Sequence, residues 1–92
     1  MSNKDFSEVT VTLVSSTWCG QCPAIKKSIN ELHKELGFNL EVLDADKDIA
    51  AVSSLRVRSL PTVIVKKEGS ATQTLVGGNP KSKYIEALEL MV

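Results

Sequence analysis

The stretch VTVTLVSSTWCGQCP, residues 9–23, joins an alternating apolar segment to both cysteines and the only tryptophan of the chain. Residues 9–14 alternate at the two-residue period of a strand, and most of them are β-branched. They therefore predict a β-strand. Cys19 and Cys22 follow a few residues later, and Pro23 comes directly after them. The stretch predicts a strand that leads straight into a pair of thiols.

A helical stripe follows the cysteines. Apolar residues recur there at spacings of four, three and four, at Ile25, Ile29, Leu32 and Leu36. This is the periodicity of one apolar helix face. Pro23 suits the first turn, where its missing N–H would have had no partner, and Gly37 suits the position just after the helix. The helix is therefore expected to begin at the cysteines.

The remaining residues predict three more strands and two more helices. Strands are expected over residues 38–44, 62–67 and 71–76, and helices over residues 49–55 and 80–91. Asp46 or Asp48 is expected near the start of the shorter helix. Asn79 is expected to cap the last helix, with Pro80 at its first position and Tyr84 or Ile85 on its buried side.

This element order, β-α-β-α-β-β-α, predicts an α/β fold with a four-stranded mixed sheet flanked by helices on both faces. A right-handed crossover makes the first two strands parallel neighbours, and a tight hairpin around Glu68 and Gly69 makes the last two antiparallel. Residues 1–92 contain no repeat, linker or low-complexity tract. We therefore expect one domain over the whole range.

Composition and charge exclude several classes of function. The chain has 92 residues, of which 42% are apolar and 24% charged, as in average globular proteins. Eleven basic residues balance eleven acidic ones, which argues against a broad nucleic-acid surface. The first residues lack the apolar core of a secretory signal, and no apolar run approaches the roughly 18 residues that span a bilayer. We expect a cytoplasmic monomer without a membrane segment.

The spacing of Cys19 and Cys22 favours redox chemistry. At a helix start, a C-x-x-C pair sets two sulfurs one turn apart, beside the positive end of the helix dipole. Such positions lower a thiol pKa from about 8.5 toward about 3.5–7.5. The outer residue, Cys19, is then expected to attack a disulfide, and Cys22 to resolve the mixed disulfide. Gly20 leaves room for a partner chain, and Trp18 offers an apolar surface beside the sulfur.

Two other interpretations of the cysteines carry less weight. A structural zinc site needs four ligands, whereas the chain offers two cysteines and one histidine, His33. An inert buried pair does not account for the tryptophan and glycine around Cys19 or for the helix after Cys22. A C-x-x-C pair within a strand–helix–strand unit is typical of a thioredoxin-like redox motif.

The stretch from Trp18 to Cys22 resembles the active-site motif W-C-G-P-C of the thioredoxin/glutaredoxin family, with Gln21 in place of proline. Residues 57–62 resemble the family's loop that ends in a cis-proline, and Gly77 resembles the glycine that lines its substrate groove. The resemblance spans nearly the whole chain, from Val9 to the last helix. It implies a minimal thioredoxin fold.

The resemblance also implies a cis bond between Leu60 and Pro61, although X–Pro bonds are cis in only about 5% of cases. Such a bond would turn the backbone of Ser59 and Leu60 outward, free to pair with an extended substrate segment. An ordinary loop proline before an edge strand is the alternative. The implied substrate-binding residues are Trp18, Gly20, Gln21, Leu60, Pro61 and Gly77.

The implied activity is reduction of protein disulfides, with no bound cofactor or metal. A flavoprotein of the thioredoxin reductase type would return the electrons from NADPH. Ribonucleotide reductase and peroxiredoxin-type enzymes are the disulfide-bearing partners that the family suggests.

The chain departs from the family pattern behind the cysteines. The family's buried aspartate falls on Leu13, and its partner lysine falls on Val42, so the usual group that takes the proton from Cys22 is missing. Too few residues precede Cys19 for the additional strand and helix of common thioredoxins. Pro23 is more typical of small glutaredoxin-like proteins.

Two rival functions remain open at this point. The first is a glutathione-dependent glutaredoxin, which the short chain and the turn at Gly77, Gly78 and Asn79 favour. Trp18, Gly20 and the lack of a basic residue next to Cys19 in the sequence oppose it. The second is a docking subunit of a larger enzyme, using the same apolar face around Trp18 and Pro61.

Overall fold

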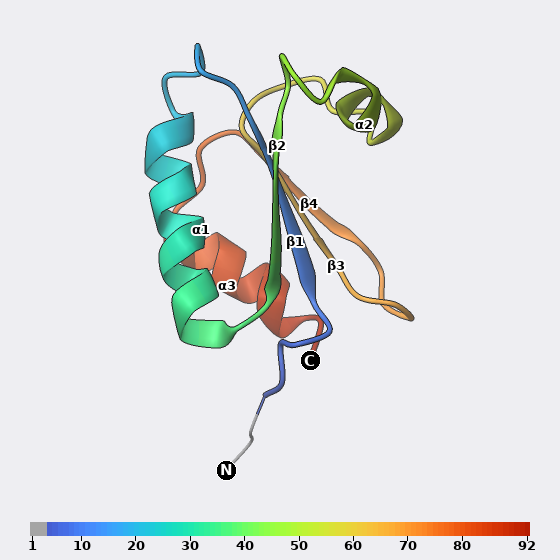
Figure 1. Ribbon diagram of the computed structural model, residues 1–92. Coiled ribbons are helices and arrows are strands. Elements are labelled where there is room, and N and C mark those ends of the chain that lie inside the picture. Colours follow the sequence, from blue (N-terminus) through green and yellow to red (C-terminus); the bar gives the residue numbers. More distant parts are fainter. Residues whose placement is uncertain (1–3) are drawn as a thin grey trace.

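The computed structural model describes residues 4–92, so the first three residues of the expected domain lie outside the described part. Residues 4–92 form four strands and three helices in the expected order. The elements are β1 (Thr10–Ser15), α1 (Cys22–Leu36), β2 (Asn39–Asp44), α2 (Ile49–Ser54), β3 (Thr62–Lys66), β4 (Gln73–Val76) and α3 (Lys81–Glu89). The predicted fold class is confirmed (Figure 1).

The strands form one mixed sheet in the order β2-β1-β3-β4. β1 pairs in parallel with β2 and antiparallel with β3, and β3 pairs antiparallel with β4. These pairings confirm that the first two strands are parallel neighbours and that the last two are antiparallel. Gly69 takes a φ of 85° in the hairpin turn, a left-handed conformation that glycine adopts without steric cost. β2 and β4 are the two edges of the sheet.

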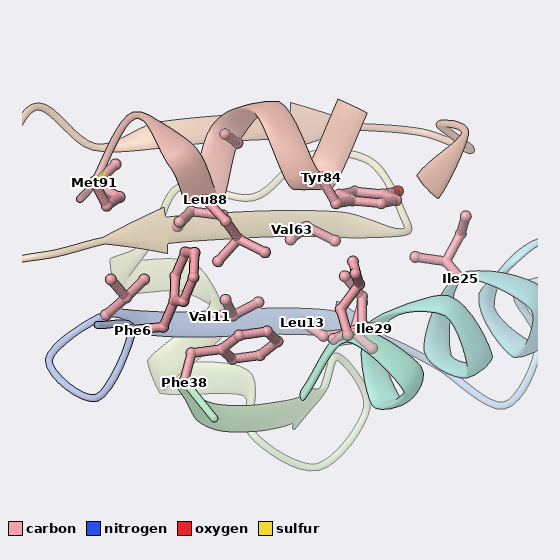
Figure 2. Close-up of a cluster of buried hydrophobic side chains, with 14 residues drawn as sticks. Phe6, Val11, Leu13, Ile25, Ile29, Phe38, Val63, Tyr84, Leu88 and Met91 are labelled. Atoms are coloured by element: carbon pink, nitrogen blue, oxygen red, sulfur yellow. The ribbon is translucent and has the colours of Figure 1, made fainter. Parts of the chain in front are cut away.

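The hydrophobic core lies between the sheet and the pair α1 and α3, which lie on the same face (Figure 1). Figure 2 shows side chains of α3, among them Tyr84 and Leu88, facing those of β1 and β3. The predicted stripe of α1 supplies Ile25, Ile29 and Leu32 to this core. Gly37 ends α1 with a φ of 78°, as expected for a glycine after a helix.

The opposite face is covered mainly near one end of the sheet. Figure 1 shows α2 there, on the other side of the sheet from α1 and α3. The segment that follows α2 contributes Leu55 and Val57 to a hollow that it shares with Ile64 of β3. None of the six α2 residues is buried in the described structure, and Ile49 is 66% exposed. Helices therefore flank both faces, but only one face is fully covered.

The predicted cap of the last helix is wrong, whereas the expected position of Asp48 at the start of α2 is confirmed. Asn79 does not cap α3, because Pro80 occupies the N-cap position and the Asn79 amide donates to the carbonyl oxygens of Val76 and Gly77. Asp48 precedes α2 as expected, but its carboxylate accepts the backbone N–H of Asp44. Both side chains satisfy backbone groups of the preceding strand end, which compete with the helix for the same polar atoms.

No helix within residues 4–92 has both the length and the apolar character required to cross a bilayer.

Candidate active site

The loops with the expected site residues meet at one end of the sheet. Val14 of β1 pairs with Thr62 of β3, which pairs with Val76 of β4. Because β3 runs antiparallel to β1 and β4, the end of β1, the start of β3 and the end of β4 lie together at this end of the sheet (Figure 1). The cysteine loop, the Leu60–Pro61 loop and the Gly77 turn therefore lie at the same end.

Cys19 and Cys22 form a disulfide, with their Cα atoms 5.4 Å apart. α1 begins at Cys22, after Gln21 at the N-cap position, and Pro23 lies in its first turn. The predicted helix start is therefore confirmed, and both sulfurs lie at the positive end of the helix dipole. Cys22 is only 3% exposed, whereas Cys19 is partly exposed. Of the two sulfur-bearing residues, Cys19 is the one that a partner can reach.

Trp18 lies beside the disulfide and is 69% exposed. Its indole Nε1–H donates a hydrogen bond of 3.1 Å to Oδ1 of Asp46, in the loop that follows β2. One end of the ring is thus fixed while its apolar surface faces solvent. Asp46 was expected near a helix start, not as a partner of Trp18. The parallel pairing of β1 with β2 brings their following loops together, which is the signal that could have revealed this contact.

The peptide bond between Leu60 and Pro61 is cis, as the resemblance implied. Pro61 is buried, and its carbonyl oxygen accepts a hydrogen bond of 2.8 Å from the backbone N–H of Gly77. Gly77 has a φ of 83°, a conformation in which a side chain would strain the backbone. The Ser59 carbonyl oxygen accepts the Thr62 hydroxyl at 2.6 Å, so this carbonyl is less free to pair with a substrate than expected.

Gln21 reaches from the cysteine loop to the turn after β4. A Cβ placed on Gly78 would lie only 3.2 Å from Oε1 of Gln21, so the amide packs closely over this glycine. Gly20 has open space around its Cα and is exposed. These two residues therefore form a surface between the disulfide and the Gly77 turn.

A hollow of about 260 Å³ adjoins the disulfide. Its lining residues come from the end of β1, the cysteine loop, α1 and the end of β2: Ser15, Ser16, Thr17, Cys19, Cys22, Pro23, Lys26 and Asp44. Sequence patterns gave no role at the site to either charged residue of this set, Lys26 or Asp44. Lys26 follows Cys22 by four residues, the spacing of neighbours on one helix face, and Asp44 pairs with Ser15 in the parallel register. No basic residue stands next to Cys19 in the sequence, but Lys26 of α1 lines the same hollow as Cys19.

Leu13 and Val42 are direct partners in the β1–β2 register. Leu13 is fully buried in the core, and Val42 is 45% exposed. The two positions that carry the family's acid and base are therefore apolar neighbours in this chain. Neither side chain can accept or donate a proton.

His33 lies on α1 away from the cysteines, with its ring centroid 5.3 Å from that of Phe38. The ring packs on the side chain of Phe38, the residue just before β2. In the range 4–92, no three histidine, cysteine or carboxylate side chains are grouped as metal ligands.

Comparison with known proteins agrees with this geometry. The thioredoxin family model matches residues 3–89. Thioredoxin of Bacillus subtilis is 36% identical over 77 residues, which cover 82% of this chain and 70% of that protein. Thioredoxin of Listeria monocytogenes is 32% identical over 79 residues, which cover 84% of this chain and 77% of that protein. The solved structure of Fasciola hepatica thioredoxin superposes with a TM-score of 0.84 at 24% identity, covering 94% of this chain and 83% of the other.

The family match, these relatives and the bonded C-x-x-C pair at a helix start support the same conclusion. The chain belongs to the thioredoxin family and is a thiol–disulfide oxidoreductase.

Proposed function

We propose that this protein reduces protein disulfides through a mixed disulfide in which Cys19 attacks and Cys22 resolves. In the first step, the Cys19 thiolate bonds to one sulfur of the substrate disulfide and expels the other sulfur as a thiolate. In the second step, the Cys22 thiolate attacks the Cys19 sulfur and releases the second substrate sulfur. The substrate gains two electrons and two protons, and the protein is left with the Cys19–Cys22 disulfide.

The observation that carries this assignment is the difference in exposure between the two cysteines. Cys22 is 3% exposed, so an incoming protein disulfide has little access to its sulfur. Cys19 is partly exposed and precedes the first turn of α1, where the helix dipole favours a thiolate. The geometry of attack therefore favours Cys19, and the buried sulfur one turn away is placed to close the disulfide.

The proposed substrate platform surrounds Cys19. Trp18 supplies apolar surface, the buried Pro61 fixes the cis turn, and the Leu60 backbone is our candidate for pairing with an extended substrate segment as an added strand does. The Ser59 carbonyl already accepts the Thr62 hydroxyl, which is why we assign pairing to Leu60. The remaining proposed platform residues lie in the cysteine loop and in the turn after β4: Gly20, Gln21 and Gly77.

Members of the thioredoxin family are reduced by thioredoxin reductase and act on disulfide substrates. For this chain we propose an NADPH-dependent flavoprotein of that type as electron donor and disulfide-bearing proteins such as ribonucleotide reductase as substrates. We also propose that residues 1–92 act as one domain and as a monomer. A cytoplasmic location completes the proposal, because that compartment keeps a dithiol reduced.

Replacing single cysteines tests the assigned roles. Cys22→Ser should accumulate a mixed disulfide through Cys19 with a protein disulfide such as that of insulin, seen as a mass increase that dithiothreitol removes. Cys19→Ser should form no such adduct and should show no disulfide reductase activity. Trapping by Cys19→Ser alone would reverse the assignment. Equal trapping by both variants would contradict it.

A comparison of electron donors tests the proposed recycling. NADPH oxidation should be sustained with thioredoxin reductase and insulin, and it should be at least tenfold slower with glutathione and glutathione reductase. Turnover with glutathione alone would make the protein a glutaredoxin. A partner enzyme whose activity needs this chain but is unchanged by the double variant Cys19→Ser/Cys22→Ser would instead establish a docking subunit.

A further inference from the structure

The proposed resolving step raises a chemical requirement that the structure must meet. Cys22 is buried at 3% exposure and lies at the inner end of the disulfide, so its thiol has little bulk water to receive a proton. Burial also favours the neutral thiol over the thiolate. A nearby base is therefore needed before the Cys22 sulfur can attack.

We propose that Asp44 accepts the proton of the Cys22 thiol during resolution, while Lys26 stabilises the thiolate that forms. This inference rests on the proposed role of Cys22. Within the described residues, Asp44 is the only carboxylate and Lys26 the only ammonium group that lines the hollow beside the disulfide. Both cysteines line the same space, so the acid, the cation and the sulfurs share one environment.

The backbone fixes Asp44 at the mouth of this hollow. It is the last residue of β2 and pairs in register with Ser15 at the end of β1, whereas Glu41, the other carboxylate of the strand, pairs with Thr12. Its Oδ1 accepts the backbone N–H of Asp46 at 2.7 Å, and its own N–H donates to Asp48 Oδ2 at 2.9 Å. The first contact holds the carboxyl group in place and leaves its Oδ2 for a proton, and the second holds the Asp44 backbone.

Ser16 also lines the hollow. Its hydroxyl is buried, and among the described residues its Oγ has no hydrogen-bond partner. A buried polar atom without a protein partner is costly, and water commonly satisfies such an atom when the space is polar and large enough. A hollow of about 260 Å³ with serine, aspartate and lysine in its lining meets both conditions. A water there can carry the proton from Cys22 to Asp44.

Lys26 lies on the same helix face as Cys22, four residues later. A cation close to a thiol favours its ionised form and lowers its pKa. In the proposed step, the Cys22 S–H bond breaks and its proton passes through water to the Asp44 carboxylate. The resulting thiolate attacks the Cys19 sulfur, and the substrate sulfur leaves with the electron pair of the broken S–S bond. Asp44 then returns its proton to solvent.

The decisive variant is Asp44→Asn, because asparagine keeps the Oδ1 acceptor that the Asp46 N–H uses and removes the basic carboxylate. A mixed disulfide between Cys19 and a thionitrobenzoate group is made in the full-length protein, and release of thionitrobenzoate by Cys22 is followed by stopped flow. We expect Asp44→Asn to slow release about 100-fold at neutral pH, within the range of general-base effects. Asp44→Glu should recover at least part of the rate.

The pH profile separates proton transfer from a structural effect. In wild type, release of thionitrobenzoate should stay fast over a pH range in which release by Asp44→Asn becomes slow. The two rates should converge at alkaline pH, where hydroxide ionises the Cys22 thiol. The charged groups near Cys22 and Asp44 are Lys26 on α1 and Asp46 and Asp48 in the loop after β2. Lys26→Gln should move the Cys22 thiolate absorbance at 240 nm in a Cys19→Ser background to higher pH.

The matched control is Glu41→Gln, on the same strand but on the opposite face of the sheet, where Oε1 accepts the Thr12 hydroxyl. This variant should release thionitrobenzoate at the wild-type rate. Equal rates for Asp44→Asn and wild type across the pH range would overturn the inference. If Cys22→Ser still traps the mixed disulfide in that case, the proposed function stands and only the role of Asp44 fails.

Discussion

The two parallel strand–helix units of the chain differ sharply in how they are stabilised. β1 is buried at all but its first residue, and α1 contributes four buried residues to the protein interior. β2 has no buried residue within its six described positions, and neither has α2. The first unit thus supplies core and sulfurs, whereas the second lies at the sheet edge.

The second unit nevertheless reaches the active site through polar contacts. Asp44 lines the hollow at the disulfide, and Asp46 accepts the indole N–H of Trp18. Apolar packing therefore determines where the sulfurs lie, and the carboxylates of the edge strand and its loop determine what surrounds them. Substitutions in the first unit should change stability, and those in the second should change reactivity.

The largest difference is expected at the directly paired positions Leu13 and Val42. Leu13→Ala leaves a cavity in a fully buried site and should lower the free energy of unfolding by about 2–5 kcal/mol. Val42→Ala should lower it by less than about 1 kcal/mol, because the side chain is 45% exposed. Urea unfolding followed by far-UV circular dichroism measures both values.

Equal losses at the two positions would show that the edge strand is as tightly packed as the central one. That result would contradict the division between the units. The m-value serves as the control, since an altered m-value would mean that one variant has changed the unfolded state or the two-state behaviour.

A smaller effect, on reactivity, is expected from Asp46→Ala. The variant removes the acceptor of the Trp18 indole N–H, a contact at the surface, so stability should change by no more than about 0.5 kcal/mol. The variant should lower kcat/KM for insulin reduction about two- to tenfold, because the ring is no longer held in the position beside Cys19 that meets the substrate. Trp18 is the only tryptophan, so its fluorescence emission reports the change directly.

Asp46→Asn is the matched control, because its amide oxygen can still accept the indole N–H. It should retain most of the wild-type kcat/KM. If both variants lose activity equally, the negative charge at this position matters and the hydrogen bond does not.

Sequence patterns predicted the first unit well because its signals are local and strong. The alternation before the cysteines and the stripe from Ile25 to Leu36 each report burial on one face, and burial follows from periodicity. The placement of Cys19 and Cys22 one turn apart at a helix start followed from their spacing. Long-range packing was not needed for any of these predictions.

The contacts of the second unit could not be read in the same way. Asp44 and Asp46 look like ordinary polar residues at a strand end, and their roles depend on which loop lies beside theirs. That neighbour is set by the parallel register of β1 and β2, which a pattern in one segment does not report. Asn79 was misjudged for a related reason, since its amide bonds the end of β4 in preference to α3.

The smallest effect is expected at Asp5, which precedes the packed unit. The backbone N–H of Ser7 donates to Asp5 Oδ1 at 2.9 Å and lowers the pKa of this carboxyl below its usual value. Because the folded pKa is depressed, the ionised carboxylate stabilises the fold above the unfolded pKa. This stabilisation is lost as the pH falls through the folded pKa. Asp5→Asn should therefore unfold at a slightly lower urea concentration than wild type at pH 7 and at the same concentration near pH 2. A difference that persists at pH 2 would mean that the asparagine disturbs the turn before β1. The contact between the Ser7 N–H and the side chain of residue 5 would then stabilise the packed unit independently of charge.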